Sequence, residues 1–126
     1  MIEKIALTGV WVSDQNVSRS FYVDKLGFEI KKDTVMENGS RWIEVVPSGG
    51  ETSLTLVKPY LNQKYASVGV FTNIVFACDD IDTTFEQLKS KGVEFVEEPS
   101  LQEWGMKQAL FKDPDGNVFV LVENTE

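Results

Sequence analysis

The chain has 126 residues, of which 42% are hydrophobic and 25% charged, and its formal net charge is −8 (12 basic minus 20 acidic residues). This length and balance predict one globular domain that buries its own core. The acidic excess disfavours a nucleic-acid partner, because phosphates require a basic surface. No apolar run approaches the ~18 residues that span a bilayer, so no membrane partner is expected either.

Histidine and cysteine usage limits the chemistry of the chain. There is no histidine, and Cys78 is the only cysteine. A single thiol cannot form an internal disulfide, which favours a reducing compartment. The first residues lack the basic region and apolar stretch of a secretion signal, so we expect a cytoplasmic protein. Without histidine, no Ser–His or Cys–His nucleophile pair can be assembled.

The first half of the chain is predicted to follow the order β-α-β-β-β. A strand pattern at 5–12 precedes a helix that is capped by Asp14 and ended by Gly27. An Asn-Gly turn and a Pro-Ser-Gly-Gly turn separate the later strands. The first of those strands is predicted to begin at 28–31, and the other two are predicted at 41–46 and 53–57.

The second half repeats this order after a connector at 58–72. Its helix begins after Asp80, 66 residues after Asp14 (80 − 14), and is closed by Gly92. A repeat near half the chain length predicts two copies of one module. The predicted elements are a strand at 73–78, the helix at 82–91, a strand at 93–96, a loop at 97–105, and strands at 106–111 and 117–123.

These patterns predict an α+β fold in which two tandem β-α-β-β-β modules form a cup-shaped mixed β-sheet with the helices outside. The modules are placed at about 4–57 and 73–124 within a single domain. Each helix must cover one face of its sheet, which leaves the other face free to line the cup. Exposed sheet edges and a partly open cup also predict a homodimer that closes them.

Strand alternation selects aromatic candidates for the cup. Trp11 and Trp42 fall on the predicted cup face, and Trp104 lies in the predicted loop before the seventh strand. Flat aromatic faces in a concave site suit planar or apolar ligands. Packing in the core or in a dimer interface is the competing interpretation for all three.

Three polar residues are further candidates. Glu44 shares the predicted face of Trp42, and a carboxylate in an apolar cup could act as a base or bind a cationic ligand. A solvated strand residue is the simpler interpretation of Glu44. Asn73 and Gln108 could orient a ligand by hydrogen bonds, although Gln108 is more simply read as an exposed amide.

Two motifs inside the duplicated pattern resemble a known family. They are F-Y-V-D-K-L-G-F at 21–28 and K-D-P-D-G-N at 112–117, where Pro114 fixes one torsion and Gly116 can take a positive φ. Together they resemble the vicinal oxygen chelate superfamily, also called the glyoxalase, bleomycin resistance and extradiol dioxygenase superfamily. The resemblance covers essentially the whole chain and implies the fold described above. In this family the sites commonly lie at paired modules, often across subunits.

The resemblance also places the metal-ligand positions of the family on this chain. Metal-dependent members use a ligand, usually His, from the first strand of each module and another, usually Glu, from the last strand. The corresponding residues here are Leu7, Thr55, Asn73 and Val120. Transition-metal sites are built from imidazole, thiolate or carboxylate, so we expect no metal and no other cofactor. Glyoxalase and extradiol dioxygenase activities are therefore disfavoured, and the metal-free, drug-binding branch is implied.

Two functions of different class remain. The first is a metal-free protein that sequesters a hydrophobic or aromatic small molecule. The second is a metal-free lyase or isomerase that uses Glu44 as general base. The missing histidine and metal ligands favour the first. Its predicted ligand-binding residues are Trp11, Trp42, Trp104, Leu7, Thr55, Asn73, Gln108 and Val120.

Overall fold

The structure is a computed structural model that describes residues 1–59 and 66–124. The chain divides into two compact units, Met1–Val68 and Gly69–Glu126. Residues 60–65 of the predicted connector lie outside the described residues. No helix in the described part of the chain is long and apolar enough to cross a membrane.

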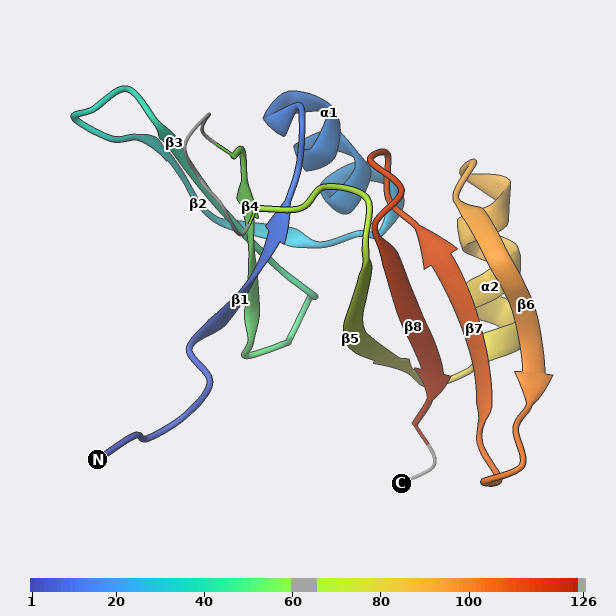
Figure 1. Cartoon of the computed structure of the whole chain (residues 1–126). Helices are drawn as coiled ribbons and strands as arrows, with labels where there is room; N and C mark the ends of the chain where they lie inside the picture. The colour runs from blue at the N-terminus through green and yellow to red at the C-terminus, as the bar shows by residue number, and fades with distance from the viewer. Residues whose placement is uncertain (60–65, 125–126) are drawn as a thin grey trace. The chain divides into compact units, whose positions relative to one another are not determined.

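The first unit holds one four-stranded sheet with the order β1-β4-β3-β2 (Figure 1). Strand β1 runs parallel to β4, and the other neighbouring strands are antiparallel. The elements are β1 (Leu7–Trp11), α1 (Gln15–Ser20), the π-helical segment η1 (Phe21–Lys25), β2 (Glu29–Val35), β3 (Arg41–Val46) and β4 (Ser53–Val57).

The second unit repeats this topology, with the sheet order β5-β8-β7-β6 and β5 parallel to β8. Its elements are β5 (Phe71–Cys78), α2 (Ile81–Ser90), β6 (Glu94–Leu101), β7 (Lys107–Lys112) and β8 (Val118–Glu123). The predicted α+β class and the duplicated β-α-β-β-β order are therefore confirmed. The cup that the two modules are expected to form stays a prediction.

The helix starts follow the acidic residues singled out in the sequence. The Asp14 carboxylate accepts hydrogen bonds from the backbone N–H groups of Asn16 and Val17, and Asp80 accepts one from Thr83. These bonds satisfy donors that a helix start leaves unpaired. Gly27 (φ 77°) and Gly92 (φ 88°) follow the helix ends in the left-handed conformation that glycine adopts without steric cost.

The first helix differs in type from the prediction of one regular helix. After α1 the chain widens into η1, where the Leu26 N–H donates to the Phe21 carbonyl at 3.1 Å, five residues back. Both aromatic residues at the start of η1, Phe21 and Tyr22, are buried, and their rings meet edge to face at 5.1 Å.

Three strand limits also need correction. Strand β1 begins at Leu7 rather than at residue 5, and β5 begins at Phe71 rather than at Asn73. Strand β6, at the edge of its sheet, extends into the predicted 97–105 loop as far as Leu101, where it still pairs with β7 after two register shifts. Pro99, which lacks a backbone donor, is tolerated in such an edge strand.

Each helix covers one face of its own sheet. In the first unit α1 packs against β3 and β4, and the apolar residues of those strands with at most 2% exposure are Ile43, Val45, Leu54 and Leu56. In the second unit α2 packs against β6 and β8, and the Phe85 and Phe95 rings meet at 4.7 Å. These apolar faces are the cores that hold the sheets in place.

The D-P-D-G-N motif of the second unit contains two buried polar residues, Asp113 and Asn117, that form several hydrogen bonds. The Asp113 side chain accepts hydrogen bonds from the N–H groups of Asp115 and Asn117 and from the Asn117 side-chain amide. The side-chain amide oxygen Oδ1 of Asn117 accepts hydrogen bonds from the backbone N–H groups of Gly69 (2.8 Å) and Val70 (3.1 Å). The motif therefore ties the start of the unit to the β7–β8 turn.

Candidate functional site

The face of the first sheet opposite the Ile43–Val45 core carries a row of three residues in register. Gly9 on β1 pairs with Thr55 on β4, and Thr55 pairs with Glu44 on β3. Because side chains alternate along each strand, Trp11 shares this face with Gly9, and Trp42 shares it with Glu44. We call it the open face; a Cβ built on Gly9 would meet no heavy atom within 4 Å.

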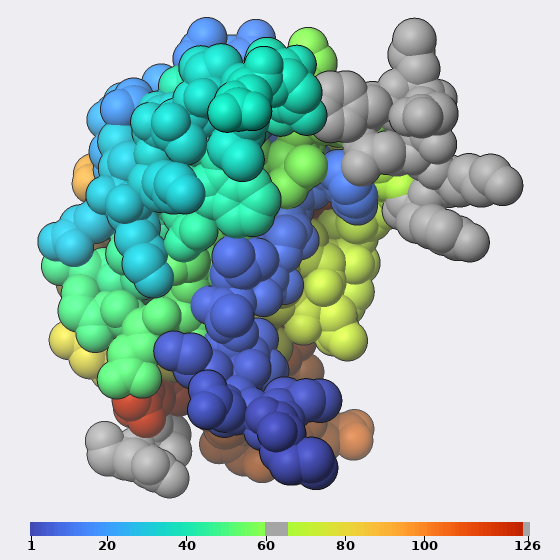
Figure 2. Space-filling view, turned by 90° about the vertical axis from the view of Figure 1, so that its left-hand side faces the viewer, coloured from blue at the N-terminus to red at the C-terminus, as the bar shows by residue number. Residues whose placement is uncertain are grey.

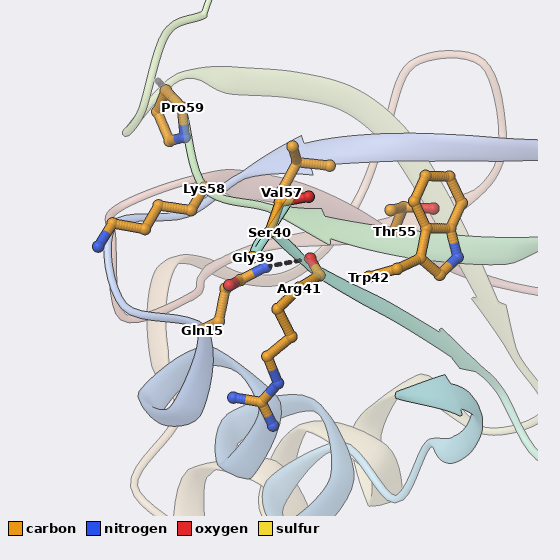
Figure 3. A pocket seen from close by; sticks show the side chains of 9 residues that line it. All are labelled: Gln15, Gly39, Ser40, Arg41, Trp42, Thr55, Val57, Lys58 and Pro59. Atoms are coloured by element: carbon orange, nitrogen blue, oxygen red, sulfur yellow. Dashed lines mark hydrogen bonds between the residues drawn. The ribbon is translucent and has the colours of Figure 1, made fainter. Parts of the chain in front are cut away.

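A cavity of about 520 Å³ includes part of this open face (Figure 3). Trp42 and Thr55 lie beside each other at one end of it, with Val57 farther along β4. The residues that line the cavity are Gln15, Gly39, Ser40, Arg41, Trp42, Thr55, Val57, Lys58 and Pro59. Among the described residues, the lining combines the apolar surfaces of Trp42, Val57 and Pro59 with polar side chains, which suits a ligand that has an apolar body and a few polar groups.

The Gln15 side chain closes the cavity toward α1 and is held by the strands. Its amide Nε2 donates to the carbonyl oxygens of Arg41 at 3.0 Å and Leu56 at 2.9 Å; Figure 3 shows the first of these bonds. Gln15 therefore links the start of α1 to β3 and β4 and fixes the shape of the cavity wall.

The Arg41 guanidinium points away from the cavity, toward the helices (Figure 3). It pairs with both carboxylate oxygens of Asp33, each at 2.9 Å, and also donates to the side chain of Asn16. The hydrogen bonds from Arg41, together with the charge of Arg19, hold the pKa of Asp33 below its usual value. Arg41 is thus committed to a structural ion pair and does not present its charge to a ligand.

Glu44 holds the indole ring of Trp42. The indole Nε1–H donates to the Glu44 carboxylate at 2.9 Å, and both side chains are half-buried. Glu44 also lines a second cavity of about 720 Å³, together with Leu7 and other residues of the N-terminal segment. The first residues of the chain, dark blue in Figure 2, lie at the surface, and Ile5 is 77% exposed.

Thr55 and Ser53 carry buried hydroxyl groups without hydrogen-bond partners among the described residues. Thr55 is 2% exposed and Ser53 is fully buried, and the two alternate onto the same face of β4. A buried hydroxyl without a partner costs about 1–3 kcal/mol. Only Thr55 lines the Trp42 cavity; Ser53 lies two residues away, opposite Leu7.

The remaining candidates fall in the second unit. Val120 and Gln108 share one face of the β7–β8 pair, since Gln108 pairs with Val122, two residues from Val120. Asn73 is exposed and has a φ of 61° at a register shift in β5, where a bulge redirects the strand. Trp104 is 58% exposed in the turn between β6 and β7.

The structure thus brings together part of the predicted set. Trp42 and Thr55 line one cavity, and Leu7 and Glu44 line the other. A single cavity lined by the three tryptophans together with Leu7, Thr55, Asn73 and Val120 stays a prediction. The sequence analysis missed Gln15, Ser40 and Val57; alternation from Thr55 could have found Val57, whereas Gln15 reaches the cavity only through the packing of α1.

The residues at the family's metal-ligand positions do not fit a transition metal. Leu7 and Val120 have no donor atom, and Thr55 and Asn73 offer only neutral oxygens. Within residues 1–59 and 66–124, no group of three or more His, Cys, Asp or Glu residues is placed to hold a metal ion.

Known proteins resemble this chain over nearly its whole length. The uncharacterized protein YetH of Bacillus subtilis (strain 168) is 43% identical over 98% of this chain and 100% of its own. A superfamily member from Sphaerobacter thermophilus has a solved structure with a TM-score of 0.89 and 36% identity, covering 98% of both chains. TnmS3, an antibiotic binding protein from Streptomyces sp. CB03234, has a TM-score of 0.86 and 35% identity, also over 98% of both chains.

A family model provides the assignment itself. It describes the Glyoxalase/Bleomycin resistance protein/Dioxygenase superfamily and matches residues 4–121. This match spans both β-α-β-β-β units, from before β1 into β8. The chain therefore belongs to the Glyoxalase/Bleomycin resistance protein/Dioxygenase superfamily.

Proposed function

We propose that this protein binds and sequesters an aromatic small molecule, and that Trp42 forms the stacking wall of its site. The observation that carries the proposal is the cavity that Trp42, Thr55 and Val57 line together, with the indole face of Trp42 at one end of it. An indole face grips planar ligands through stacking and dispersion. The residues proposed to complete the site are Trp11, Leu7, Asn73, Gln108, Val120 and Trp104.

The comparisons support a binding role. TnmS3, which is 35% identical over 98% of both chains, is described as an antibiotic binding protein. A second structure from the same Streptomyces strain, a glyoxalase/bleomycin resistance protein, is 36% identical over 94% of this chain. These descriptions concern the neighbours, and they favour a small-molecule ligand for this chain as well.

We further propose that binding requires no metal. The four family positions hold Leu7, Thr55, Asn73 and Val120, which together supply too few donors for a transition metal. Metal analysis of protein purified without chelators should give well below one equivalent of zinc, nickel, manganese or iron. A stoichiometric, tightly held metal would contradict the proposal.

The protein is also proposed to form a homodimer in the cytoplasm. Large apolar side chains are exposed in each unit, among them Val35 (69%) and Leu101 (71%), and the edge strand β2 is exposed along its length. A partner copy would cover such edges. Light scattering should give about twice the chain mass of 14.2 kDa; a monomer at micromolar concentration would contradict the proposal. The single thiol of Cys78 favours the reducing compartment.

A thermal-shift screen of aromatic compounds tests the binding proposal. A ligand at about 100 times its Kd should add ~2.7 kcal/mol to the free energy of unfolding. For the ligand found, Trp42→Ala should reduce affinity by on the order of 1–3 kcal/mol. Trp42→Phe is the matched variant, because it keeps an aromatic face and should lose less. Equal affinity in wild type and Trp42→Ala would refute the site.

The same ligand separates sequestration from catalysis by Glu44. Ligand recovered unchanged after long incubation supports sequestration. Conversion that stops in Glu44→Gln, while binding persists, would instead establish the lyase or isomerase alternative. Glu44 sits opposite Thr55 on the open face, so either role would place it beside the ligand.

A further inference from the structure

We propose that Thr55 is a specificity-determining residue, and that its hydroxyl selects aromatic ligands that carry a neutral hydrogen-bonding substituent. This inference rests on the proposed binding function and names the class of ligand. A hydroxyl, carbonyl or amide on the ring would pair with Thr55 while the ring stacks on Trp42.

The buried hydroxyl of Thr55 has no hydrogen-bond partner among the described residues. Thr55 is 2% exposed and lines the Trp42 cavity. Figure 3 shows the Thr55 side chain beside the indole ring of Trp42. Buried polar groups in proteins are almost always paired, so an unpaired hydroxyl on a residue that lines a cavity is a candidate partner for a ligand atom. A threonine hydroxyl both donates and accepts, and therefore serves a ligand group of either kind.

The negative charge of Glu44, which lies beside Thr55, further restricts which ligand substituents can bind at Thr55. Glu44 is the register partner of Thr55 on the neighbouring strand, at a Cβ separation of about 4.5–5.5 Å for such a pair. Its carboxylate accepts the indole N–H of Trp42 and lies on the same face. A ligand carboxylate at Thr55 would face this like charge, whereas a neutral substituent would not. Lys58, which also lines the cavity, follows the end of β4 and extends away from Thr55 in Figure 3.

Ser53 provides a matched internal control. It lies two residues before Thr55 on the same face of β4, is fully buried, and its hydroxyl is likewise unpaired among the described residues. Unlike Thr55, it is not among the residues that line the Trp42 cavity. A purely structural effect of losing a buried hydroxyl should appear equally in Ser53→Ala and Thr55→Val.

The test compares the affinities of 2-naphthol and 2-methylnaphthalene for wild type and for Thr55→Val. The two ligands differ by a hydroxyl in place of a methyl group, and Thr55→Val makes the same exchange in the protein. Affinities are measured by nuclear magnetic resonance from the Trp42 indole N–H signal. In wild type, 2-naphthol should bind about 3–10-fold more tightly than 2-methylnaphthalene, as one net hydrogen bond allows. Thr55→Val should abolish this ratio, whereas Thr55→Ser and Ser53→Ala should retain it. Both Thr55→Val and Ser53→Ala should unfold no more easily than wild type.

A third probe tests the charge restriction. 2-Naphthoate should bind more weakly than 2-naphthol in wild type. In Glu44→Gln the difference in affinity between these two ligands should be smaller. The inference is overturned if both naphthalenes bind wild type equally, or if Thr55→Val keeps the preference for 2-naphthol. If no naphthalene moves the Trp42 signal, this inference is overturned, whereas the proposed function falls only if the wider screen of aromatic compounds also finds no ligand.

Discussion

The indole Nε1–H of Trp42 donates a hydrogen bond to the Glu44 carboxylate over 2.9 Å, two residues along the same strand. This bond fixes the direction of the ring on the open face of β3, where both side chains are half-buried. A side chain that is already ordered loses less conformational entropy when a ligand binds. Glu44 therefore acts as a positioning residue for the proposed stacking wall.

Replacement of Glu44 tests whether its hydrogen bond positions the Trp42 ring. Glu44→Leu removes the acceptor, so the indole N–H loses its partner and affinity for an aromatic ligand should fall about 3–10-fold. Glu44→Gln keeps a side-chain oxygen and should stay within about twofold of wild type. The Trp42 indole N–H chemical shift should move in Glu44→Leu and barely in Glu44→Gln. Unchanged shift and affinity in Glu44→Leu would refute the positioning role.

Removal of the Asn117 side chain should destabilise the second unit. Asn117 is fully buried, accepts from the N–H groups of Gly69 and Val70, and donates to Asp113. Asn117→Ala would leave these groups unpaired and should cost about 2–4 kcal/mol of unfolding free energy. Urea denaturation followed by circular dichroism measures the change. Gln87→Ala, at an exposed position of α2, is the control and should stay within about 0.5 kcal/mol.

The Asp33 ion pair predicts an acid-dependent loss of stability. The pKa of Asp33 lies below its usual value of 3.8, first because Arg41 hydrogen-bonds to its carboxylate. A lowered folded-state pKa stabilises the protein above pH 3.8 and loses that contribution as pH falls through the folded-state value. Asp33→Asn should therefore be less stable than wild type at neutral pH, by about 1 kcal/mol, with the gap closing below pH 3.8.

Unfolding free energies measured across this pH range test the Asp33 prediction. The exposed Asp24 of η1 offers a matched control, and Asp24→Asn should stay within about 0.5 kcal/mol of wild type at neutral pH. A gap for Asp33→Asn that stays constant down to the lowest pH would mean that its ionised form contributes no net stability.

Cys78 should react slowly with thiol reagents. Burial raises the pKa of its thiol above 9.0, and its sulfur donates weakly to the Val122 carbonyl at 3.5 Å. The thiolate is the reactive form, and a raised pKa lowers the fraction of it that is present. Its reaction with Ellman's reagent should be at least about tenfold slower than that of glutathione. A rate equal to that of glutathione would contradict the account, and denatured protein gives the reference rate.

The sequence predicted those features that depend on local signals. Asp14 and Asp80 mark the helix starts, Gly27 and Gly92 mark their ends, and strand alternation places Trp42 opposite the side of Ile43 and Val45. The π-helical turn at Phe21 and the extension of β6 past Pro99 were not predicted, because they depend on packing and on the edge position of the strand.

The candidate site was harder to predict than the fold. The importance of Thr55 lies in its unpaired hydroxyl, which becomes visible only when its neighbours across β1 and β3 are known. Gln15 reaches the cavity because α1 packs against β3 and β4, and no motif in the sequence predicts that contact.

The most direct test of the account is a titration of chelator-treated protein with aromatic compounds, followed through the Trp42 indole N–H signal and ended by recovery of the ligand. We expect a saturable shift of this signal in the absence of metal and a ligand that is recovered unchanged. In Trp42→Ala, which lacks the signal, thermal shift should report an affinity lower by on the order of 1–3 kcal/mol. Failure of every aromatic compound to shift the signal, or binding that appears only after a divalent metal is added, would contradict it.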